Sequence, residues 1–291
     1  MSALLDPGFV RELEALRRRM EVRARSGAAG EHIAKRRGGS AEFHEHRTYA
    51  AGDDLRRIDW SAYARSGEPV VKVFRAEEDV VARLLCDTSA SLDYGEPAKI
   101  EVARRLAAAI GYMTLAESER AQVIETASGA LREHTTARGR GGLPGLLRAL
   151  DGIAPRGHTD LSTSIDNLVR RRSVRPGMLV VLSDFFDPGP VLSALTRAVS
   201  RGHDVFLVQV IAPEEEDPDF DGDWTFEDAE TGELLDLTLD AAAIEAYLAR
   251  FAGLCQQLRG WSRKHGATYV RVRTDEGLEA PVRRLVGRQV D

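Results

Sequence analysis

The stretch VVARLLCDTSAS at residues 80–91 joins an apolar run to a series of oxygen-bearing side chains. Val80–Cys86 is short and mostly apolar, which is typical of a strand buried on both faces of a parallel sheet. Asp87, Ser89 and Ser91 follow it at alternate positions. Alternate residues of an extended segment face the same way, so these three side chains can converge on one point. The stretch therefore predicts a buried strand with a polar site at its carboxyl end.

Strand-like and helix-like segments alternate from this stretch to the end of the chain. Further strands are expected at Ala121–Thr126, Ala130–Thr135, Met178–Leu182, Val205–Ile211 and Thr268–Val272. Helices are expected at Ala98–Glu117, Leu143–Ile153, Leu161–Arg171, Val191–Arg201, Ala241–His265 and Leu278–Val286. This alternation predicts an α/β fold with a doubly wound, mostly parallel sheet and helices on both of its faces. Two strand-like runs within Asp223–Leu239 predict a β-hairpin inserted into that pattern.

The chain before this region has a different character. Residues 10–25 have the apolar spacing of an amphipathic helix, and residues 31–80 are polar and rich in turn-forming residues. We therefore expect a smaller N-terminal region over residues 1–77 and an α/β domain over residues 78–291.

Composition excludes several classes of protein. The 291 residues carry a net charge of −6, which argues against general binding of nucleic acid because that needs a cationic face. No stretch approaches the roughly 20 apolar residues that cross a bilayer, so we expect a soluble, cytoplasmic protein with no membrane span. Cys86 and Cys255 are expected to be buried thiols. From Asp204 to Asp240 there are many carboxylates and no Lys or Arg, which predicts an acidic surface suited to a basic partner.

Two later segments can complete the polar site. Thr159 precedes the expected helix Leu161–Arg171, and Asp184 follows the expected strand Met178–Leu182. Ligands of such sheets bind outside the carboxyl ends of the strands, so these side chains are expected to meet Asp87. Carboxylate and hydroxyl oxygens suit Mg²⁺ better than zinc, with Mn²⁺ and Ca²⁺ as further candidates. The expected metal ligands are therefore Asp87, Ser89, Ser91, Thr159 and Asp184.

The ordered set of five residues resembles the metal-ion-dependent adhesion site (MIDAS) of von Willebrand factor A (vWA) domains. Asp-x-Ser-x-Ser follows the first core strand, a threonine lies in a middle loop, and an aspartate follows a later strand. The resemblance implies a vWA-like fold in which Mg²⁺ binds an acidic side chain from a partner protein. It implies a protein–protein interaction module.

A second resemblance lies upstream, in RTYAAGDDLRRIDW at residues 47–60. This segment is similar to the signature R-x-Y-x-x-G-D-D-x-R-x-I-D-W of the family named domain of unknown function 58 (DUF58), and the similarity extends over roughly residues 30–290. Genes of that family often lie beside genes for MoxR-type AAA+ ATPases. The resemblance therefore implies an adaptor that works with such an ATPase in assembling or remodelling protein complexes. Many members begin with transmembrane helices, and this chain departs from them there.

Two other functions remain open at this stage. A metal-dependent hydrolase would use the same ion with His158 or Asp160 as general base. A metal-free scaffold would use the hydroxyl groups only to cap loops. No G-x-S-x-G, H-E-x-x-H or Walker A motif is present, so we expect no enzyme, no catalytic residue and no organic cofactor. Asp160 is expected to cap the helix that it precedes, and Glu214–Asp217 is expected to be a solvated loop.

Overall fold

The computed structural model describes residues 3–25, 42–50, 53–75, 81–127, 130–171, 173–219, 222–228 and 232–287. The chain divides into two compact units, one formed by Met1–Gly30 together with Val80–Asp291 and the other by Glu31–Asp79. The boundary expected near residue 77 therefore lies close to the end of the smaller unit. The expected grouping of the first helix with that unit differs from the structure, which places this helix in the larger unit.

The larger unit is built on a seven-stranded sheet with the order β11-β8-β7-β3-β4-β5, in which β6 also pairs with β4. Strands β11, β8, β7, β3 and β4 pair in parallel, whereas β5 and β6 run antiparallel to β4. This arrangement confirms the predicted α/β fold with a mostly parallel sheet. The strands are β3 (Val81–Cys86), β4 (Arg120–Ala127), β5 (Ala130–Glu133), β6 (Ala137–Arg138), β7 (Met178–Ser183), β8 (Asp204–Ile211) and β11 (Thr268–Arg273).

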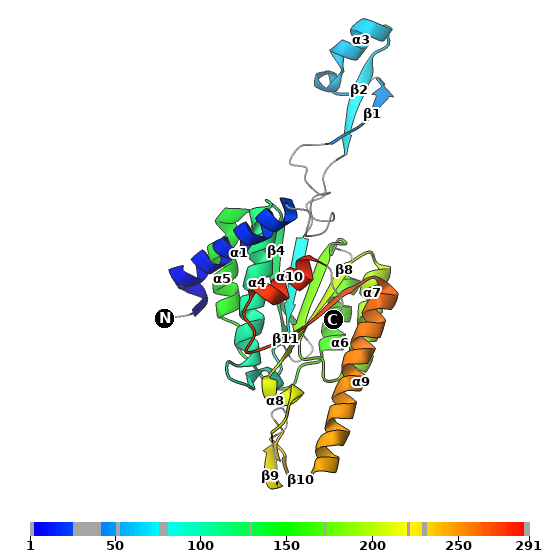
Figure 1. Ribbon diagram of the computed structural model, residues 1–291. Helices are drawn as coiled ribbons and strands as arrows, with labels where there is room; N and C mark the ends of the chain where they lie inside the picture. The colour runs from blue at the N-terminus through cyan, green and yellow to red at the C-terminus, as the bar shows by residue number, and fades with distance from the viewer. Residues whose placement is uncertain are drawn as a thin grey trace. The chain divides into compact units, whose positions relative to one another are not determined.

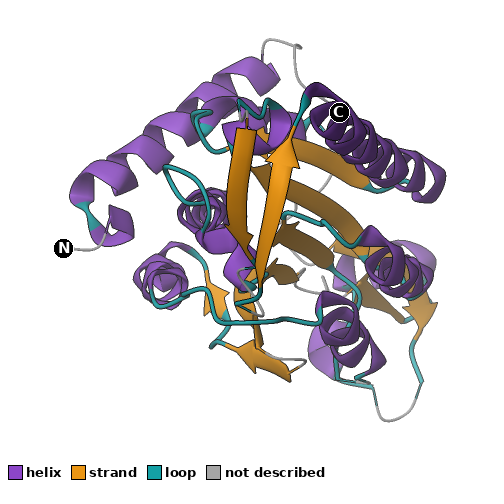
Figure 2. Ribbon diagram, turned by 90° about the horizontal axis from the view of Figure 1, so that it is seen from below, coloured by secondary structure: helices purple, strands orange, loops and turns teal. Residues whose placement is uncertain are grey.

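Helices cover both faces of the sheet (Figure 2). In β7, Leu179 and Val181 join the hydrophobic core on one face, while Val180 and Leu182 join the core on the other. This alternation follows from the two-residue period of a strand, and it explains why the strands are apolar throughout. One layer holds α1 (Pro7–Arg25), α4 (Lys99–Ala116), α5 (Leu143–Asp151) and α10 (Glu279–Val286), and the other holds α6 (Leu161–Arg170), α7 (Pro188–Ser200) and α9 (Ala241–His265).

The N-terminal helix α1 packs against the core of the larger unit. Leu13 and Leu16 are fully buried in the same hydrophobic cluster as residues of α4 and α5. An ion pair of 3.1 Å joins Glu12 to Arg105 of α4. This burial is the physical reason why α1 belongs to the larger unit.

Strand β8 is followed by the short helix α8 (Pro213–Glu216) and by an antiparallel hairpin of β9 (Gly222–Glu227) and β10 (Leu234–Leu239). The hairpin confirms the predicted insertion. It extends from the larger unit at the end where α8 lies, beside the first turns of α9 (Figure 1). The expectation of a solvated loop over Glu214–Asp217 was wrong, because most of this segment forms α8 and the Glu215 side chain is largely buried.

The smaller unit consists of β1 (Glu42–Thr48), the 3₁₀ turn η2 (Leu55–Arg57), α3 (Trp60–Ser66) and β2 (Val70–Arg75), with β1 and β2 antiparallel. Its acidic residues shape the backbone. Asp53 accepts hydrogen bonds from Arg47 and from the amide of Ala50, while Asp54 and Asp59 cap η2 and α3. The aspartates of the segment RTYAAGDDLRRIDW thus hold turns and helix starts in place. Three further 3₁₀ turns lie in the larger unit at η1 (Ala3–Leu5), η3 (Ala90–Asp93) and η4 (Arg140–Gly142).

The sequence also predicts buried free thiols and no membrane-spanning helix. Both thiols are free and buried, as predicted, and burial raises the pKa of Cys86 to about 12. In the described part of the chain, no helix combines the length and the apolar character that crossing a membrane requires.

Candidate metal centre

The five predicted side chains lie on loops that follow β3, precede α6 and follow β7. Backbone hydrogen bonds tie these loops together: the Ala90 amide donates to the Gly157 carbonyl at 2.9 Å, and the Arg156 amide donates to the Thr88 carbonyl at 2.7 Å. The Asp87 amide donates to the Leu182 carbonyl of β7 at 2.9 Å. Because β3 and β7 are parallel neighbours, their carboxyl ends bring the Asp87 and Asp184 loops to one edge of the sheet.

Asp87 is the centre of the first half of the site. Its side chain accepts hydrogen bonds from Thr159 Oγ1 at 2.7 Å and from Ser183 Oγ at 2.7 Å. It also accepts from the Ser89 amide at 3.0 Å and from Thr126 Oγ1 at 3.4 Å. All four donors are neutral. Asp87 is only 4% exposed, so its negative charge lies in a dry environment of neutral partners.

Asp184 is the centre of the second half. Ser91 Oγ donates to Asp184 Oδ2 at 2.8 Å, and Ser89 Oγ lies 3.0 Å from Ser91 Oγ. Ser183, the neighbour of Asp184 in sequence, bonds Asp87 and so links the two halves. The structure therefore brings all five predicted residues together. That they bind a metal ion stays a prediction.

The charge on Asp87 is costly in this environment. Burial raises the pKa of the Asp87 carboxyl, and the nearby Asp184 carboxylate raises it as well. The hydroxyl donors of Ser183 and Thr159 oppose that rise. A cation at this place would offset both unfavourable effects, since an opposite charge favours the ionised form of a carboxyl group.

Lys99 is a component of the site that the sequence analysis did not identify. It is the first residue of α4, and it is only 1% exposed. Its ammonium group lies 2.9 Å from Asp184 Oδ2 and 2.6 Å from Glu215 Oε1 of α8. The rings of Phe186 and Tyr94 flank it, with centroids 5.1 and 5.9 Å away. Lys99 thus gives Asp184 a cationic partner, whereas the described residues place none beside Asp87.

Further buried groups hold Asp184 in position. Gln209 of β8 donates from Nε2 to the Asp184 carbonyl at 2.9 Å, and Tyr269 of β11 donates its hydroxyl proton to Gln209 Oε1 at 2.6 Å. The next residue, Phe185, has a φ of +56°, a backbone conformation that residues other than glycine adopt only at a cost in free energy. The backbone after β7 is therefore fixed by packing and by a polar network.

The donor set fits a hard cation. Two carboxylates and three hydroxyl groups offer only oxygen atoms, which Mg²⁺ and Ca²⁺ prefer. Within the described ranges, no three side chains of His, Cys, Asp or Glu gather where they could hold a metal ion, so hydroxyl groups would have to supply part of the ligand set. The described residues also include no ion-pair partner for Asp87, although its carboxylate is buried.

The two residues considered as general bases differ in their surroundings. Asp160 is the N-cap of α6 and accepts hydrogen bonds from the Thr163 amide at 2.9 Å, from Thr163 Oγ1 at 2.6 Å and from Ser162 Oγ at 2.8 Å. This confirms its predicted capping role. Side-chain and backbone hydrogen bonds from Thr163 lower the pKa of Asp160, which makes it a weaker base. His158 is exposed on the preceding loop.

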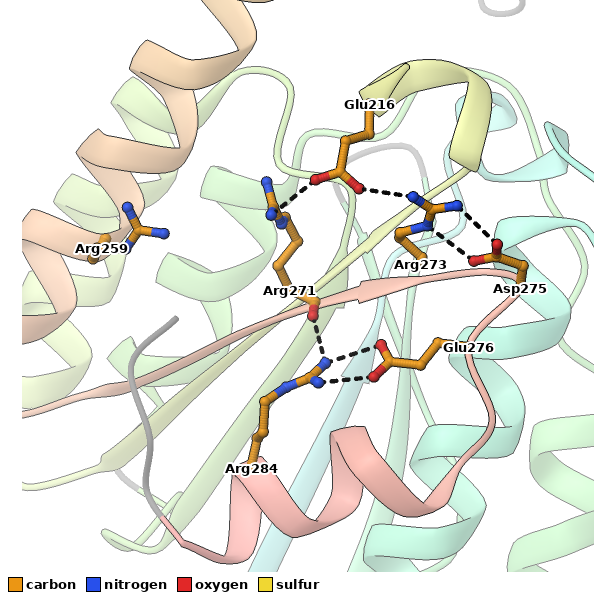
Figure 3. Close-up of a pocket in the computed structure, with 7 residues that line it drawn as sticks. All are labelled: Glu216, Arg259, Arg271, Arg273, Asp275, Glu276 and Arg284. Atoms are coloured by element: carbon orange, nitrogen blue, oxygen red, sulfur yellow. Dashed lines mark hydrogen bonds and ion pairs between the residues drawn. The ribbon is translucent and has the colours of Figure 1, made fainter. Parts of the chain in front are cut away.

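A pocket of about 670 Å³ lies between α8, β11 and α10, and none of the five predicted ligands lines it (Figure 3). Its charged groups largely pair with one another. Glu216 pairs with Arg271 at 2.8 Å and with Arg273 at 3.5 Å, while Arg284 pairs with Glu276 at 2.8 Å. Adjacent glutamates of α8 thus point to two places, Glu215 to Lys99 and Glu216 to the arginines of β11. The ion pairs of the pocket help to position α8.

The mostly parallel sheet with helices on both faces makes this chain an α/β protein, and its polar cluster lies at the carboxyl ends of the strands. The family model described as "Protein of unknown function DUF58" matches residues 45–253, and the chain belongs to this family. It is also similar to the uncharacterized protein Rv1480 of Mycobacterium tuberculosis, with 33% identity over 292 residues, which cover 97% of this chain and 90% of that protein.

Several solved structures are similar in fold. BatB, described as a conserved hypothetical protein from Bacteroides thetaiotaomicron, aligns with 72% of this chain and 98% of its own at 16% identity and a TM-score of 0.47. The SpRpn10 VWA domain aligns with 74% of this chain and 100% of its own at 10% identity and a TM-score of 0.42.

Proposed function

We propose that this chain is a Mg²⁺-dependent protein–protein docking module. The side chains that would hold the ion are Asp87, Ser89, Ser91, Thr159 and Asp184. One observation carries the proposal: the Asp87 carboxylate is buried among neutral donors at the point where three loops converge. A buried carboxylate without a cationic partner is unfavourable, and a bound cation would offset that cost.

The hydroxyl groups explain why docking fits better than catalysis. Ser89, Ser91 and Thr159 offer neutral oxygens, so a bound ion would keep positive charge with which to accept a carboxylate from a partner protein. Lys99 already neutralises part of the charge on Asp184, which leaves still less negative charge to satisfy the ion. The hydrolase alternative is weakened because Asp160 serves as a helix cap with a lowered pKa.

The partner that we propose is a MoxR-type AAA+ ATPase, with this chain as its adaptor in assembling or remodelling protein complexes. The support for that partner is the family resemblance. An acidic side chain on the partner would bind at the metal centre.

Isothermal titration calorimetry with MgCl₂ tests the metal site. We expect wild type to bind Mg²⁺ and Asp87→Asn to bind it at least tenfold more weakly, a loss of about 1.4 kcal/mol or more. The amide preserves the size of the side chain and removes its charge. Asp160→Asn is the matched control, since it makes the same change in a nearby carboxylate outside the cluster, and its affinity should equal that of wild type.

Equal affinity of wild type and Asp87→Asn would contradict the proposed site, and absence of binding to wild type would favour the metal-free scaffold.

Copurification tests the partner. Wild type should retain the ATPase in Mg²⁺ and release it in EDTA, while Asp87→Asn should not retain it in either buffer.

A further inference from the structure

The β9–β10 hairpin is an amphipathic ribbon. In its register, Trp224 lies opposite Leu237 and Phe226 lies opposite Leu235. Side chains of paired residues lie on one face of a ribbon, and the residues two positions along a strand share it. These four residues therefore form one face, which we call the apolar face of the hairpin.

The opposite face is polar and internally bonded. Thr225 donates to Asp236 at 2.6 Å, and Thr238 donates to Asp223 at 2.6 Å. Both bonds join cross-strand pairs of the register, which fixes these side chains on the polar face. Leu234, opposite Glu227, is the large apolar side chain of this second face.

A large part of the apolar face is exposed to solvent. The exposed fractions are 45% for Trp224, 36% for Phe226, 57% for Leu235 and 42% for Leu237. A contiguous exposed patch of this kind, with aromatic side chains at its centre, is typical of a protein interaction site.

Charge decides which occupant fits. Residues 222–239 include six carboxylates and no Lys or Arg, namely Asp223, Glu227, Asp228, Glu230, Glu233 and Asp236. A second copy of this chain would bring two such acidic sets together, and an anionic membrane would repel them. A cationic partner is attracted by the same charges.

We propose that the apolar face of the hairpin is a docking surface for a basic amphipathic helix of a partner protein. The side-chain repeat along one face of a strand matches that along one face of a helix. Alternate residues of a strand are about 6.6 Å apart, and residues i and i+4 of a helix are about 6 Å apart. Leucine-like side chains of the helix would pack on Trp224 and Leu235, and flanking Lys or Arg would meet Asp228 and Glu233, which lie two positions from Phe226 and Leu235 and therefore on the same face. This surface is separate from the metal centre and does not depend on a bound ion.

A synthetic helix tests the proposal. The probe is a fluorescein-labelled peptide of about 18 residues, made of Leu and Lys with one apolar face. Fluorescence anisotropy with the full chain should show saturable binding that weakens as NaCl is added. Leu235→Thr/Leu237→Thr should weaken it at least tenfold. Leu234→Thr is the matched control, because it makes the same change in the same strand on the polar face, and its affinity should equal that of wild type. Threonine retains strand propensity, and circular dichroism checks the fold.

Other outcomes would overturn the proposal. Equal affinity of the double variant and wild type would do so, as would equal binding of a scrambled Leu/Lys peptide that has no apolar face. Dimerisation in sedimentation velocity that Leu235→Thr/Leu237→Thr abolishes would identify a second copy as the occupant. Binding to phosphatidylglycerol vesicles that the same variant abolishes would identify a membrane. Asp87→Asn should bind the peptide as wild type does, so failure here is distinguishable from failure of the metal site.

Discussion

Lys99 contributes a positive charge to the candidate metal centre. Lys99 pairs directly with the carboxylates of Asp184 and Glu215, and the charge of Asp184 in turn acts on the Asp87 carboxyl group. Burial raises the pKa of Glu215, while the Lys99 ammonium lowers it. Lys99 therefore stabilises the cluster in the absence of any other cation, and it would compete with a metal ion for Asp184.

Replacing this lysine should make the protein more dependent on metal. Lys99→Met leaves two buried carboxylates without their partner, which should lower the free energy of unfolding by about 3 kcal/mol in EDTA. Added Mg²⁺ should restore more stability to this variant than it gives to wild type, because the competing ammonium is gone. Urea unfolding with EDTA or MgCl₂ measures both effects.

The double variant Lys99→Met/Glu215→Gln is the control for that experiment. It removes one charge of each sign, so we expect it to be more stable in EDTA than Lys99→Met alone. Equal stabilisation of wild type and Lys99→Met by Mg²⁺ would show that Lys99 and the ion do not compete.

Among the elements, α6 shows how local chemistry positions the site. Its N-cap Asp160 immediately follows Thr159, so the start of this helix sets the position of a proposed ligand. Asp160→Ala should lower the free energy of unfolding by about 1 kcal/mol at pH 7, whereas Asp160→Asn should change it little because asparagine is also a good N-cap. Urea unfolding of the three proteins measures this order.

The pH dependence of the Asp160 cap has a definite sign. Hydrogen bonds from Thr163 lower its pKa in the folded state below the unfolded value of about 3.9. The ionised cap therefore stabilises the protein above that pH, and the contribution is lost as pH falls through the folded value. The difference between wild type and Asp160→Ala should shrink between pH 5 and pH 2. A difference that grows toward acid pH would contradict this assignment.

The elements also show what sequence patterns reveal. Helix α9 has the bounds predicted, Ala241–His265, because Asp240 caps its start and Gly266 ends it in a left-handed conformation. The parallel strands were recognisable from their apolar runs, and the five oxygen-bearing residues from their places after strands and before a helix. The roles of Lys99 and α8 could not be recognised in the sequence. A lysine at the start of a helix and a run of glutamates both look like solvated residues, and only the fold brings Lys99 and Glu215 into contact.

At the scale of the whole molecule, the first helix is an integral part of the larger unit. Leu13 of α1 is fully buried in the core that α4 and α5 share. Leu13→Ala should lower the free energy of unfolding by about 2–5 kcal/mol, because it creates a cavity in that core. Leu5→Ala, at an exposed position of the same segment, is the matched control and should have little effect. Urea unfolding that follows near-ultraviolet circular dichroism measures both, and equal stability of wild type and Leu13→Ala would contradict the packing described for α1.

The placement of α1 has a consequence for biosynthesis. Helix α1 ends at Arg25 and its packing partner α4 begins at Lys99, so 99 − 25 = 74 positions separate them along the chain. At about 5–20 residues per second, the ribosome needs roughly 4–15 s to make that stretch. Throughout this interval the apolar face of the nascent helix cannot pack on α4, and the smaller unit is synthesised before α4 follows it. Newly made chains should therefore expose Phe9, Leu13 and Leu16 to ribosome-associated chaperones until α4 emerges from the exit tunnel of the ribosome.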